Sequence, residues 1–243
     1  MEVTSNKQTM KLDILAFGAH PDDVELSCAG TILKHISVGK KTGIVDLTKG
    51  ELGTRGNAAI RMKEAAKAAK ILGVTIRENL NFADGFFQND KKHQLEIIKI
   101  IRKYQPEIVL ANALTDRHPD HSRGSQLISE ACFYSGLIKI KTGNQKTWRP
   151  KAMYHYIQDR YIKPDFVIDV SAFMEKKLEA IAAFSSQFYN PKSNEPETPL
   201  TSPYFSEFVK ARASNFGRII NVQYAEGFVA ERSIGVNSFF DLL

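Results

Sequence analysis

Short apolar runs alternate with longer amphipathic segments along the first 135 residues of the chain. The apolar runs are bounded by loops that contain glycine, proline or asparagine, which is typical of strands buried on both faces of a sheet. The longer segments are rich in Ala, Lys, Glu and Leu and place apolar residues at helical spacing, so they predict helices. The predicted strands are 12–19, 42–48, 80–82 and 107–112; the predicted helices are 24–38, 58–72, 95–104 and 122–134, the last capped by Ser122.

Residues 135–243 add further strands and helices to this pattern. Segments 153–157 and 166–170 are strand-like, 225–234 is extended, and 173–184 and 206–216 are helical. Segment 187–203 holds four of the nine prolines and predicts a long loop. The alternation of strands and helices predicts an α/β fold with a doubly wound, mainly parallel sheet and helices on both faces, in a single domain over residues 1–243.

Composition and charge are those of an ordinary globular protein and exclude several classes. Lys and Arg number 33 against 27 Asp and Glu, and the net charge of +6 is spread without a run of five like charges, so nucleic acid is not an expected partner. A small anionic substrate accounts for the excess of basic residues equally well. Apolar runs are shorter than the ~18 residues of a membrane span, the N-terminus is polar, and two cysteines cannot form a disulfide framework. We therefore expect a cytoplasmic protein with no membrane partner.

Two clusters of histidine and aspartate follow strands of the predicted sheet. Residues 19–25 read Ala-His-Pro-Asp-Asp-Val-Glu directly after the first strand, and residues 116–121 read Asp-Arg-His-Pro-Asp-His after the 107–112 strand. Ligands of parallel sheets bind beyond the carboxyl ends of the strands, so both clusters stand where a site is expected. An Asp-Asp pair ahead of a helix also serves as an N-cap, and His-Pro is a common turn. The occurrence of both clusters at equivalent strand ends favours a functional site.

Imidazole and carboxylate in this combination point to a metal ion. They are ligands suited to zinc, and a catalytic site needs three of them with a position left open for water. Fe(II) or Mn(II) can also occupy a histidine and aspartate site with open positions. A further carboxylate has to stay free to take a proton from water, and the adjacent Asp22 and Asp23 can divide these two tasks.

The two motifs resemble those of the LmbE/PIG-L family of zinc-dependent deacetylases, and the resemblance extends from about residue 12 to the C-terminal region. Residues 48–57, Thr-Lys-Gly-Glu-Leu-Gly-Thr-Arg-Gly-Asn, add to it. Within the family the chain is most similar to the branch that deacetylates N-acetylglucosaminyl-malate in bacillithiol biosynthesis. The resemblance implies a Rossmann-like fold and hydrolysis of an N-acetyl group on an amino sugar conjugate. Ser27 stands where a glycine is common in the family, which leaves every implied ligand in place.

The resemblance also implies roles for individual residues. His20, Asp23 and His121 match the zinc ligands, and Asp22 matches the general base. The remaining implied roles are support or polarisation at the metal by His118 and Asp120, contact with the carbonyl oxygen by Tyr204, and contact with the substrate by Arg55 and Arg117. Arg55 lies between Gly53 and Gly56, where the backbone can approach a ligand closely, and its guanidinium suits the carboxylates of a malyl group. Arg149 is a further candidate for substrate contact, from its own or a neighbouring subunit.

Other functions remain open from the sequence alone. A relative could act on another acetylated glycan or on a mycothiol-like amide conjugate. A nucleotide-binding module is disfavoured because the loop after the first strand lacks the glycine-rich turn that holds pyrophosphate and carries acids instead. A metal-binding protein without catalysis is the third alternative. We also expect a homo-oligomer, with residues 239–243 forming either an apolar interface or a strand docked on the core.

Overall fold

The computed structural model describes residues 10–191 and 193–242, and within them the strands form one seven-stranded sheet. The strands are β1 Ile14–Gly18, β2 Thr42–Thr48, β3 Ile76–Phe82, β4 Ile108–Ala111, β5 Ala152–Tyr156, β6 Phe166–Asp169 and β7 Ala225–Ala230. The α-helices are α1 Asp23–Ser37, α2 Ala58–Leu72, α3 Lys91–Tyr104, α4 Pro119–Ser135, α5 Met174–Ala182 and α6 Phe205–Ile219. Short 3₁₀-helices cover η1 Ser171–Phe173, η2 Pro199–Thr201 and η3 Phe239–Leu242.

The strand order confirms the predicted doubly wound α/β fold. The order is β3-β2-β1-β4-β5-β7-β6, and the first five of these strands are parallel. β7 runs antiparallel to both β5 and β6. The chain moves outward from β1 to β3 and then returns to place β4 on the other side of β1, so the order reverses between β1 and β4. In sheets of this kind the ligand site lies at the carboxyl ends of the two strands that flank the reversal.

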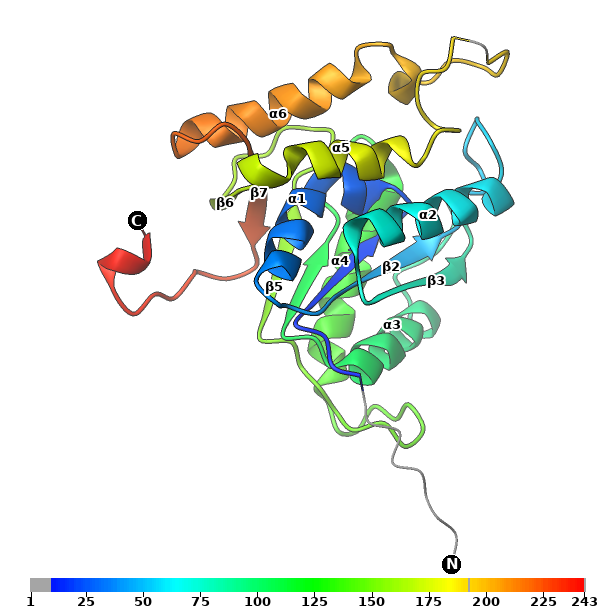
Figure 1. The fold of residues 1–243 in the computed structure, drawn as a ribbon. Helices are drawn as coiled ribbons and strands as arrows, with labels where there is room; N and C mark the ends of the chain where they lie inside the picture. The colour runs from blue at the N-terminus through cyan, green and yellow to red at the C-terminus, as the bar shows by residue number, and fades with distance from the viewer. Residues whose placement is uncertain (1–9, 192, 243) are drawn as a thin grey trace, which may run out of the picture.

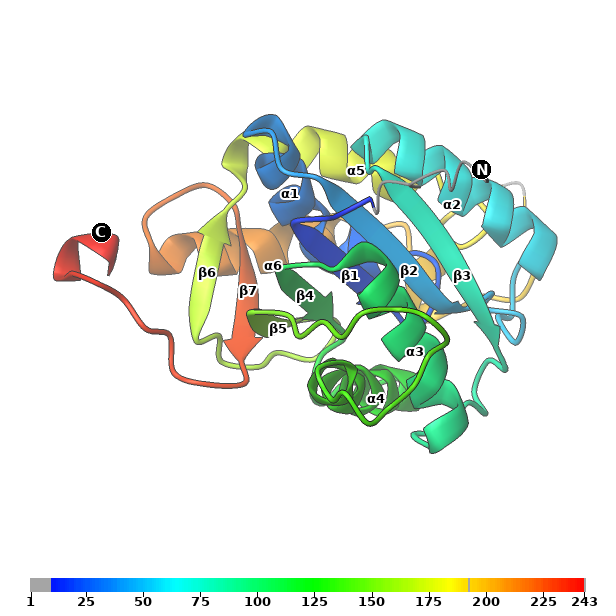
Figure 2. The same cartoon turned by 90° about the horizontal axis from the view of Figure 1, so that it is seen from below.

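Helices cover both faces of the sheet. Helices α1, α2 and α5 lie on one face, and α3 and α4 lie on the other (Figures 1 and 2). Every residue of β1 and β2 is buried, because these central strands are covered on both faces, and their side chains contribute to an apolar core on each side. Among the described residues, no helix is both long and apolar enough to cross a bilayer.

Two predicted elements extend further than the apolar pattern indicated. The strand predicted at 80–82 is β3, which begins at Ile76; it lies at the edge of the sheet and is mostly half-buried, so it lacks a continuous apolar run. Helix α3 begins at Lys91 rather than at residue 95. Asp90 caps it by accepting a hydrogen bond from the His93 amide at 3.0 Å, and the polar first turn after the cap hides the helical periodicity.

The predicted cap of α4 and one prediction for the C-terminus are wrong. α4 begins at Pro119, and the Nδ1 atom of His118, rather than Ser122, accepts the first free amide. Ser122 lies inside the helix, where its hydroxyl donates to the carbonyl of Pro119. Residues 239–242 form the exposed η3 rather than a strand docked on the core, with Phe239 and Phe240 88% and 81% exposed, and residue 243 lies outside the described residues. An interface at this segment stays a prediction.

Candidate metal centre

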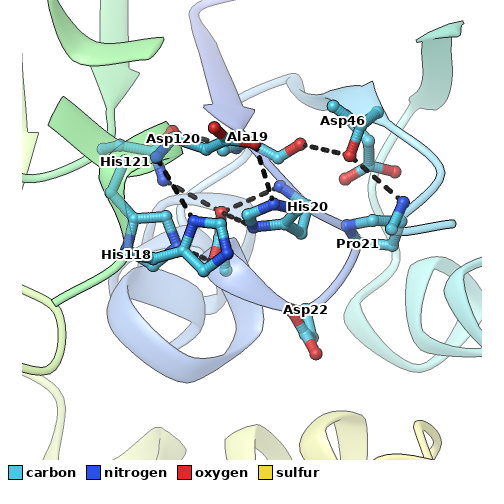
Figure 3. A network of polar contacts seen from close by, with 12 residues as sticks. Ala19, His20, Pro21, Asp22, Asp46, His118, Asp120 and His121 are labelled. Atoms are coloured by element: carbon cyan, nitrogen blue, oxygen red, sulfur yellow. Dashed lines mark hydrogen bonds and ion pairs between the residues drawn. The ribbon is translucent and has the colours of Figure 1, made fainter. Parts of the chain in front are cut away.

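Three imidazoles meet where the loops after β1 and β4 come together. The ring centroids of His20 and His118 are 4.6 Å apart, those of His20 and His121 5.5 Å, and those of His118 and His121 5.3 Å. Figure 3 shows the three rings gathered beside the end of β1. One ring nitrogen from each lies within 4.8 Å of the others, which is a separation that one ion can bridge. The sheet therefore brings together the two sequence motifs that lie a hundred residues apart.

One ring nitrogen of His20 and one of His121 are each paired with a carboxylate. Nδ1 of His121 lies 2.5 Å from Asp116 Oδ2, and Nε2 of His20 lies 3.0 Å from Asp84 Oδ1. When each imidazole is neutral, the nitrogen that faces the carboxylate carries the proton, and the other nitrogen keeps its lone pair. The lone pairs available to a metal are therefore on His121 Nε2 and His20 Nδ1. A carboxylate behind a ligating histidine is the usual arrangement in metal sites.

Both of these nitrogens face the carboxylate of Asp23. His121 Nε2 is 3.1 Å from Asp23 Oδ1, and His20 Nδ1 is 3.7 Å from Asp23 Oδ2. The Asp23 carboxylate is held in place by the backbone amide of His20 at 2.9 Å and by the side-chain amides of Asn112 at 2.9 Å and Gln158 at 3.1 Å. Two nitrogen donors and one carboxylate on a common side form a set that suits Zn²⁺, Fe(II) or Mn(II). The predicted ligands His20, Asp23 and His121 thus lie next to one another, and their role as ligands of a divalent ion stays a prediction.

His118 differs from the other two histidines in its protonation. The backbone amide of Asp120 donates to His118 Nδ1 at 3.2 Å, so this nitrogen has no proton and Nε2 carries it in the neutral ring. Burial and the charges of His20 and His121 lower the pKa of His118, which keeps the ring neutral. A neutral ring with its proton on Nε2 is a hydrogen-bond donor. This favours His118 as a polarising group over His118 as a third imidazole ligand.

The side chains of His20, Asp23, His118 and His121, which we call the metal cluster, lie among acids that favour a positive charge. Burial lowers the pKa of His20, but hydrogen bonds with Asp120 and Asp84 and the charge of Asp23 outweigh it and raise this pKa to about 10. Burial likewise opposes protonation of His121, yet Asp23 and Asp116 raise its pKa to about 9. Without a metal, both rings therefore hold protons that offset the surrounding acids. A divalent cation would supply the same compensation and displace those protons.

Asp22 does not cap helix α1, although it stands at the cap position. Its side chain accepts no hydrogen bond from the first turn of the helix; instead its Oδ2 accepts one from Arg61 Nη2 at 2.9 Å. The backbone of Asp22 has φ 116°, a conformation that is costly for a residue with a side chain and is often found at functional sites. In Figure 3 the Asp22 carboxylate points away from the three imidazoles. The capping explanation is therefore excluded for Asp22, and its role as a base stays a prediction.

Asp120 lies against the metal cluster as a support for His20. The Asp120 carboxylate is fully buried, and its Oδ2 lies 3.4 Å from His20 Nε2. The same oxygen accepts the Gly85 amide at 2.8 Å, and Oδ1 is paired with Arg123 Nη1 at 2.5 Å. These contacts fix Asp120 behind the ring of His20, so its position fits the supporting role implied by the motif.

Within the described residues, the side chains of the four remaining predicted site residues make no hydrogen bond or ion pair with the metal cluster. Arg55 is buried against residues 188 and 195, and Arg117 is paired at the surface with Asp159 at 2.8 Å. Tyr204 is 66% exposed at the start of α6. Arg149 stacks on Phe133 and donates to its carbonyl, near the C-terminal end of α4, whereas the cluster is at the N-terminal end. Within its own subunit Arg149 therefore does not reach the cluster, and a contribution to a neighbouring subunit stays a prediction.

Five further residues complete the site: Asp84, Asn112, Gln158 and Arg61 lie outside the two motifs, and Asp116 opens the second motif without an assigned role. Four of them follow the carboxyl ends of parallel strands: Asp84 follows β3, Asn112 and Asp116 follow β4, and Gln158 follows β5. Their positions gave the signal that could have identified them, because polar residues just beyond parallel strands face the ligand site. Arg61 gave no comparable signal, since it lies inside α2.

Asn112 is predicted to control metal affinity without contacting the metal. Its amide group donates to Asp23 Oδ2 at 2.9 Å, and its carbonyl oxygen accepts the Ala19 amide at 2.9 Å. We expect Asn112→Ala to weaken metal binding about 10–100-fold, because loss of such supporting groups usually has this effect. Competition with a chromophoric chelator measures the affinity, with the exposed Asn144→Ala as a control. Equal affinities in the two variants would contradict the supporting role.

Comparisons with known proteins show which family this chain is similar to. The family profile described as PIG-L, GlcNAc-PI de-N-acetylase, matches residues 15–132. A diacetylchitobiose deacetylase of Thermococcus kodakarensis is 30% identical over 225 residues, which covers 88% of this chain and 81% of that protein. A probable N-acetyl-alpha-D-glucosaminyl L-malate deacetylase 2 of Bacillus anthracis is 29% identical over 191 residues, covering 72% and 81%. A solved structure of a conserved protein from Thermus thermophilus superposes with a TM-score of 0.84 at 34% identity, covering 93% and 98%.

Proposed function

This chain belongs to the PIG-L family of deacetylases, and on that premise we propose that it hydrolyses the acetamide of an N-acetylglucosamine unit with the help of a divalent metal ion. The metal is held by His20, Asp23 and His121, and zinc is the ion that we expect there. One observation carries the proposal: the lone-pair nitrogens of both histidines face the carboxylate of Asp23, at 3.7 Å and 3.1 Å. Asp84 and Asp116 hold the two rings in that orientation through the ring nitrogens that do not face Asp23.

The residues around the proposed metal site have separate tasks in the reaction. When bound, a divalent ion supplies Lewis-acid activation of water and of the amide carbonyl. Asp22 accepts the proton that water loses as it attacks the carbonyl carbon, and returns a proton to the nitrogen as the carbon–nitrogen bond breaks. The Nε2 proton of His118 forms a hydrogen bond with the carbonyl oxygen as negative charge develops on it. The products are acetate and a free amine.

Tyr204 is the second donor proposed for the carbonyl oxygen. The residue stands at the start of α6, and its exposed side chain is free to move toward a bound substrate. Its role rests on the family resemblance alone, because within the described residues its hydrogen bonds are made by its backbone, with the hydroxyl of Ser202 and with the amides of Glu207 and Phe208. His118 therefore carries the larger part of this role in the mechanism.

Two kinds of substrate follow from the relatives. One relative is named for diacetylchitobiose, a neutral disaccharide, and another for N-acetylglucosaminyl malate, an anionic conjugate. Both contain the same acetamide, so the metal cluster does not distinguish them. The distinction has to come from residues that contact the group attached to the sugar, and Arg55 and Arg117 are the predicted candidates. The sequence prediction of the malate conjugate is one of these two possibilities.

Acetate release is the test of the proposed function. Purified protein loaded with Zn²⁺, Fe(II) or Mn(II) is incubated with N,N′-diacetylchitobiose, N-acetylglucosaminyl-malate and free N-acetylglucosamine, and acetate is measured. We expect release from at least one glycoside, its loss in the presence of a chelator, and its return when metal is added. Metal binding without acetate from any of the three would instead support a metal-binding protein without catalysis.

A nucleotide-binding function is disfavoured by Asp22 and Asp23, whose charges stand where a phosphate would bind at the start of α1.

A further inference from the structure

Arg55 and Gly56 form a carboxylate-binding site that the protein itself fills. Glu195 Oε1 accepts the Gly56 amide at 3.0 Å, and Glu195 Oε2 lies 3.4 Å from Arg55 Nε. Arg55 Nη1 donates to the carbonyl of Phe188 at 3.2 Å, and the whole Arg55 residue is only 5% exposed. An arginine beside a free backbone amide is a suitable receptor for a carboxylate. Here both oxygens of Glu195 already occupy it.

The loop that carries Arg55 also contacts the metal cluster. The Leu52 amide donates to Asp84 Oδ2 at 2.9 Å, and the Asp84 amide donates to Glu51 Oε1 at 2.9 Å. Asp84 in turn holds the ring of His20 at 3.0 Å. Arg55 is therefore three residues from a direct contact with the cluster, at a position from which it can act on a group attached to the reacting sugar.

The backbone and the burial of Arg55 keep it in this arrangement. Its carbonyl oxygen accepts a hydrogen bond from Gln187 Nε2 at 2.8 Å, so the segment 187–203 is joined to the Arg55 loop at both the backbone and the side chain. A carboxylate tethered to the same chain acts at an effective concentration on the order of millimolar or more. A free anionic substrate has to displace Glu195 and also open the packing around a buried guanidinium. A neutral substrate meets neither obstacle.

The second predicted arginine is also paired with an acid of the chain. Arg117 Nε lies 2.8 Å from Asp159 Oδ2, and the two side chains are 46% and 53% exposed. An exposed pair of this kind is weak, so Arg117 stays available to a ligand more readily than Arg55 does. The pairing still removes the net positive charge that would attract an anion from solution. The specificity argument therefore depends on Arg55 and Glu195.

We propose that Glu195 is a specificity-determining residue, which occupies Arg55 and restricts this enzyme to electrically neutral N-acetylglucosamine conjugates. The proposal rests on the deacetylase function proposed above and names the substrate class for that site. Glu195 acts by filling the position that a substrate carboxylate would need. Removal of its charge leaves the receptor of Arg55 and Gly56 intact and unneutralised, so carboxylate-bearing conjugates then gain a partner.

A comparison of two substrates tests the proposal. We measure kcat/KM for N,N′-diacetylchitobiose and for N-acetylglucosaminyl-malate with the metal-loaded wild-type protein and with Glu195→Gln. The wild type is expected to prefer the neutral disaccharide by about tenfold or more, and Glu195→Gln is expected to shift the ratio toward the malate conjugate by about tenfold, the usual effect of a hydrogen bond to a charged group. The double variant Glu195→Gln/Arg55→Met should lose this gain, because it removes the receptor. Thermal unfolding of each variant shows that it is folded.

Controls separate a specific effect of Glu195 from a general effect of charge. Glu197→Gln changes the net charge equally, two positions along the same exposed loop, and should leave the ratio at the wild-type value. A wild-type preference for the malate conjugate would overturn the specificity proposal and leave the deacetylase function standing. A neutral preference that Glu195→Gln does not change would also overturn it. Absence of acetate from both substrates would overturn the deacetylase function itself.

Discussion

Asp22→Asn is expected to lower kcat for acetate release about 10²–10⁴-fold while the protein keeps its full metal content. Asparagine has nearly the same shape as aspartate but cannot take a proton, so the variant removes the base and little else. Burial raises the pKa of Asp22 to about 7, against the opposing charge of Arg61, so the carboxyl group can accept and release a proton near neutral pH. Measurement of acetate release at saturating substrate, with metal quantified in the same sample, tests this prediction.

Two comparisons make the Asp22 result interpretable. Asp90→Asn removes the same charge at the cap of α3, where asparagine is also a good cap, and should leave kcat unchanged. Arg61→Lys keeps a positive charge near Asp22 but loses the guanidinium that donates to both Pro21 and Asp22, so a smaller loss of kcat is expected there. Undiminished turnover in Asp22→Asn would show that Asp22 only anchors Arg61 and that another group takes the proton.

The central part of the fold could be predicted because its residues are buried on both faces of the sheet. β1 and β4 read as continuous apolar runs, β2 as a mainly apolar run that contains Asp46, and α2 agrees with its predicted bounds of 58–72 because Asn57 caps it and Gly73 ends it with φ 75°. The parallel order then follows from the alternation of strands and helices, and it places the two histidine motifs side by side at the reversal between β1 and β4. The ligands His20, Asp23 and His121 could be named for this reason.

The rest of the site depends on contacts that a sequence pattern does not contain. Asp84 and Asp116 act through the outer nitrogens of the histidines, and nothing in their spacing shows which ring each one faces. The pairing of Arg55 with Glu195 joins residues that are 140 positions apart, in two loops without periodicity. The sequence alone therefore predicts an Arg55 side chain that is free to bind a substrate. The side chain that neutralises it could be found only once the loops were placed.

Arg77 of β3 is a residue of the core whose contacts the sequence pattern also does not predict. The sequence pattern placed Arg77 outside any predicted strand, yet its guanidinium lies between two acids that are themselves fully buried. Arg77 Nη1 is 2.5 Å from Glu25 Oε1, and Arg77 Nε is 2.8 Å from Asp46 Oδ2. Glu25 therefore does not face the metal site; it extends from the first turn of α1 toward β3. In addition to the backbone pairing of β3 with β2, Arg77 links the edge strand to a side chain of α1 and to one of β2.

Arg77→Met is expected to lower the free energy of unfolding by about 3–5 kcal/mol, because it leaves two buried carboxylates without a cation. Burial already raises the pKa of Glu25, and loss of Arg77, which lowers it, raises that pKa further. A carboxyl group whose pKa is higher in the folded than in the unfolded protein lowers the free energy of unfolding at pH values above its unfolded pKa. Protonation of the group at lower pH removes this loss of stability. The loss of stability caused by Arg77→Met, measured by urea unfolding, should therefore be smaller at pH 5 than at pH 8.

The control is the exposed Arg218→Met, which should change the free energy of unfolding by less than about 0.5 kcal/mol. An equally small change in Arg77→Met would mean that water reaches Glu25 and Asp46.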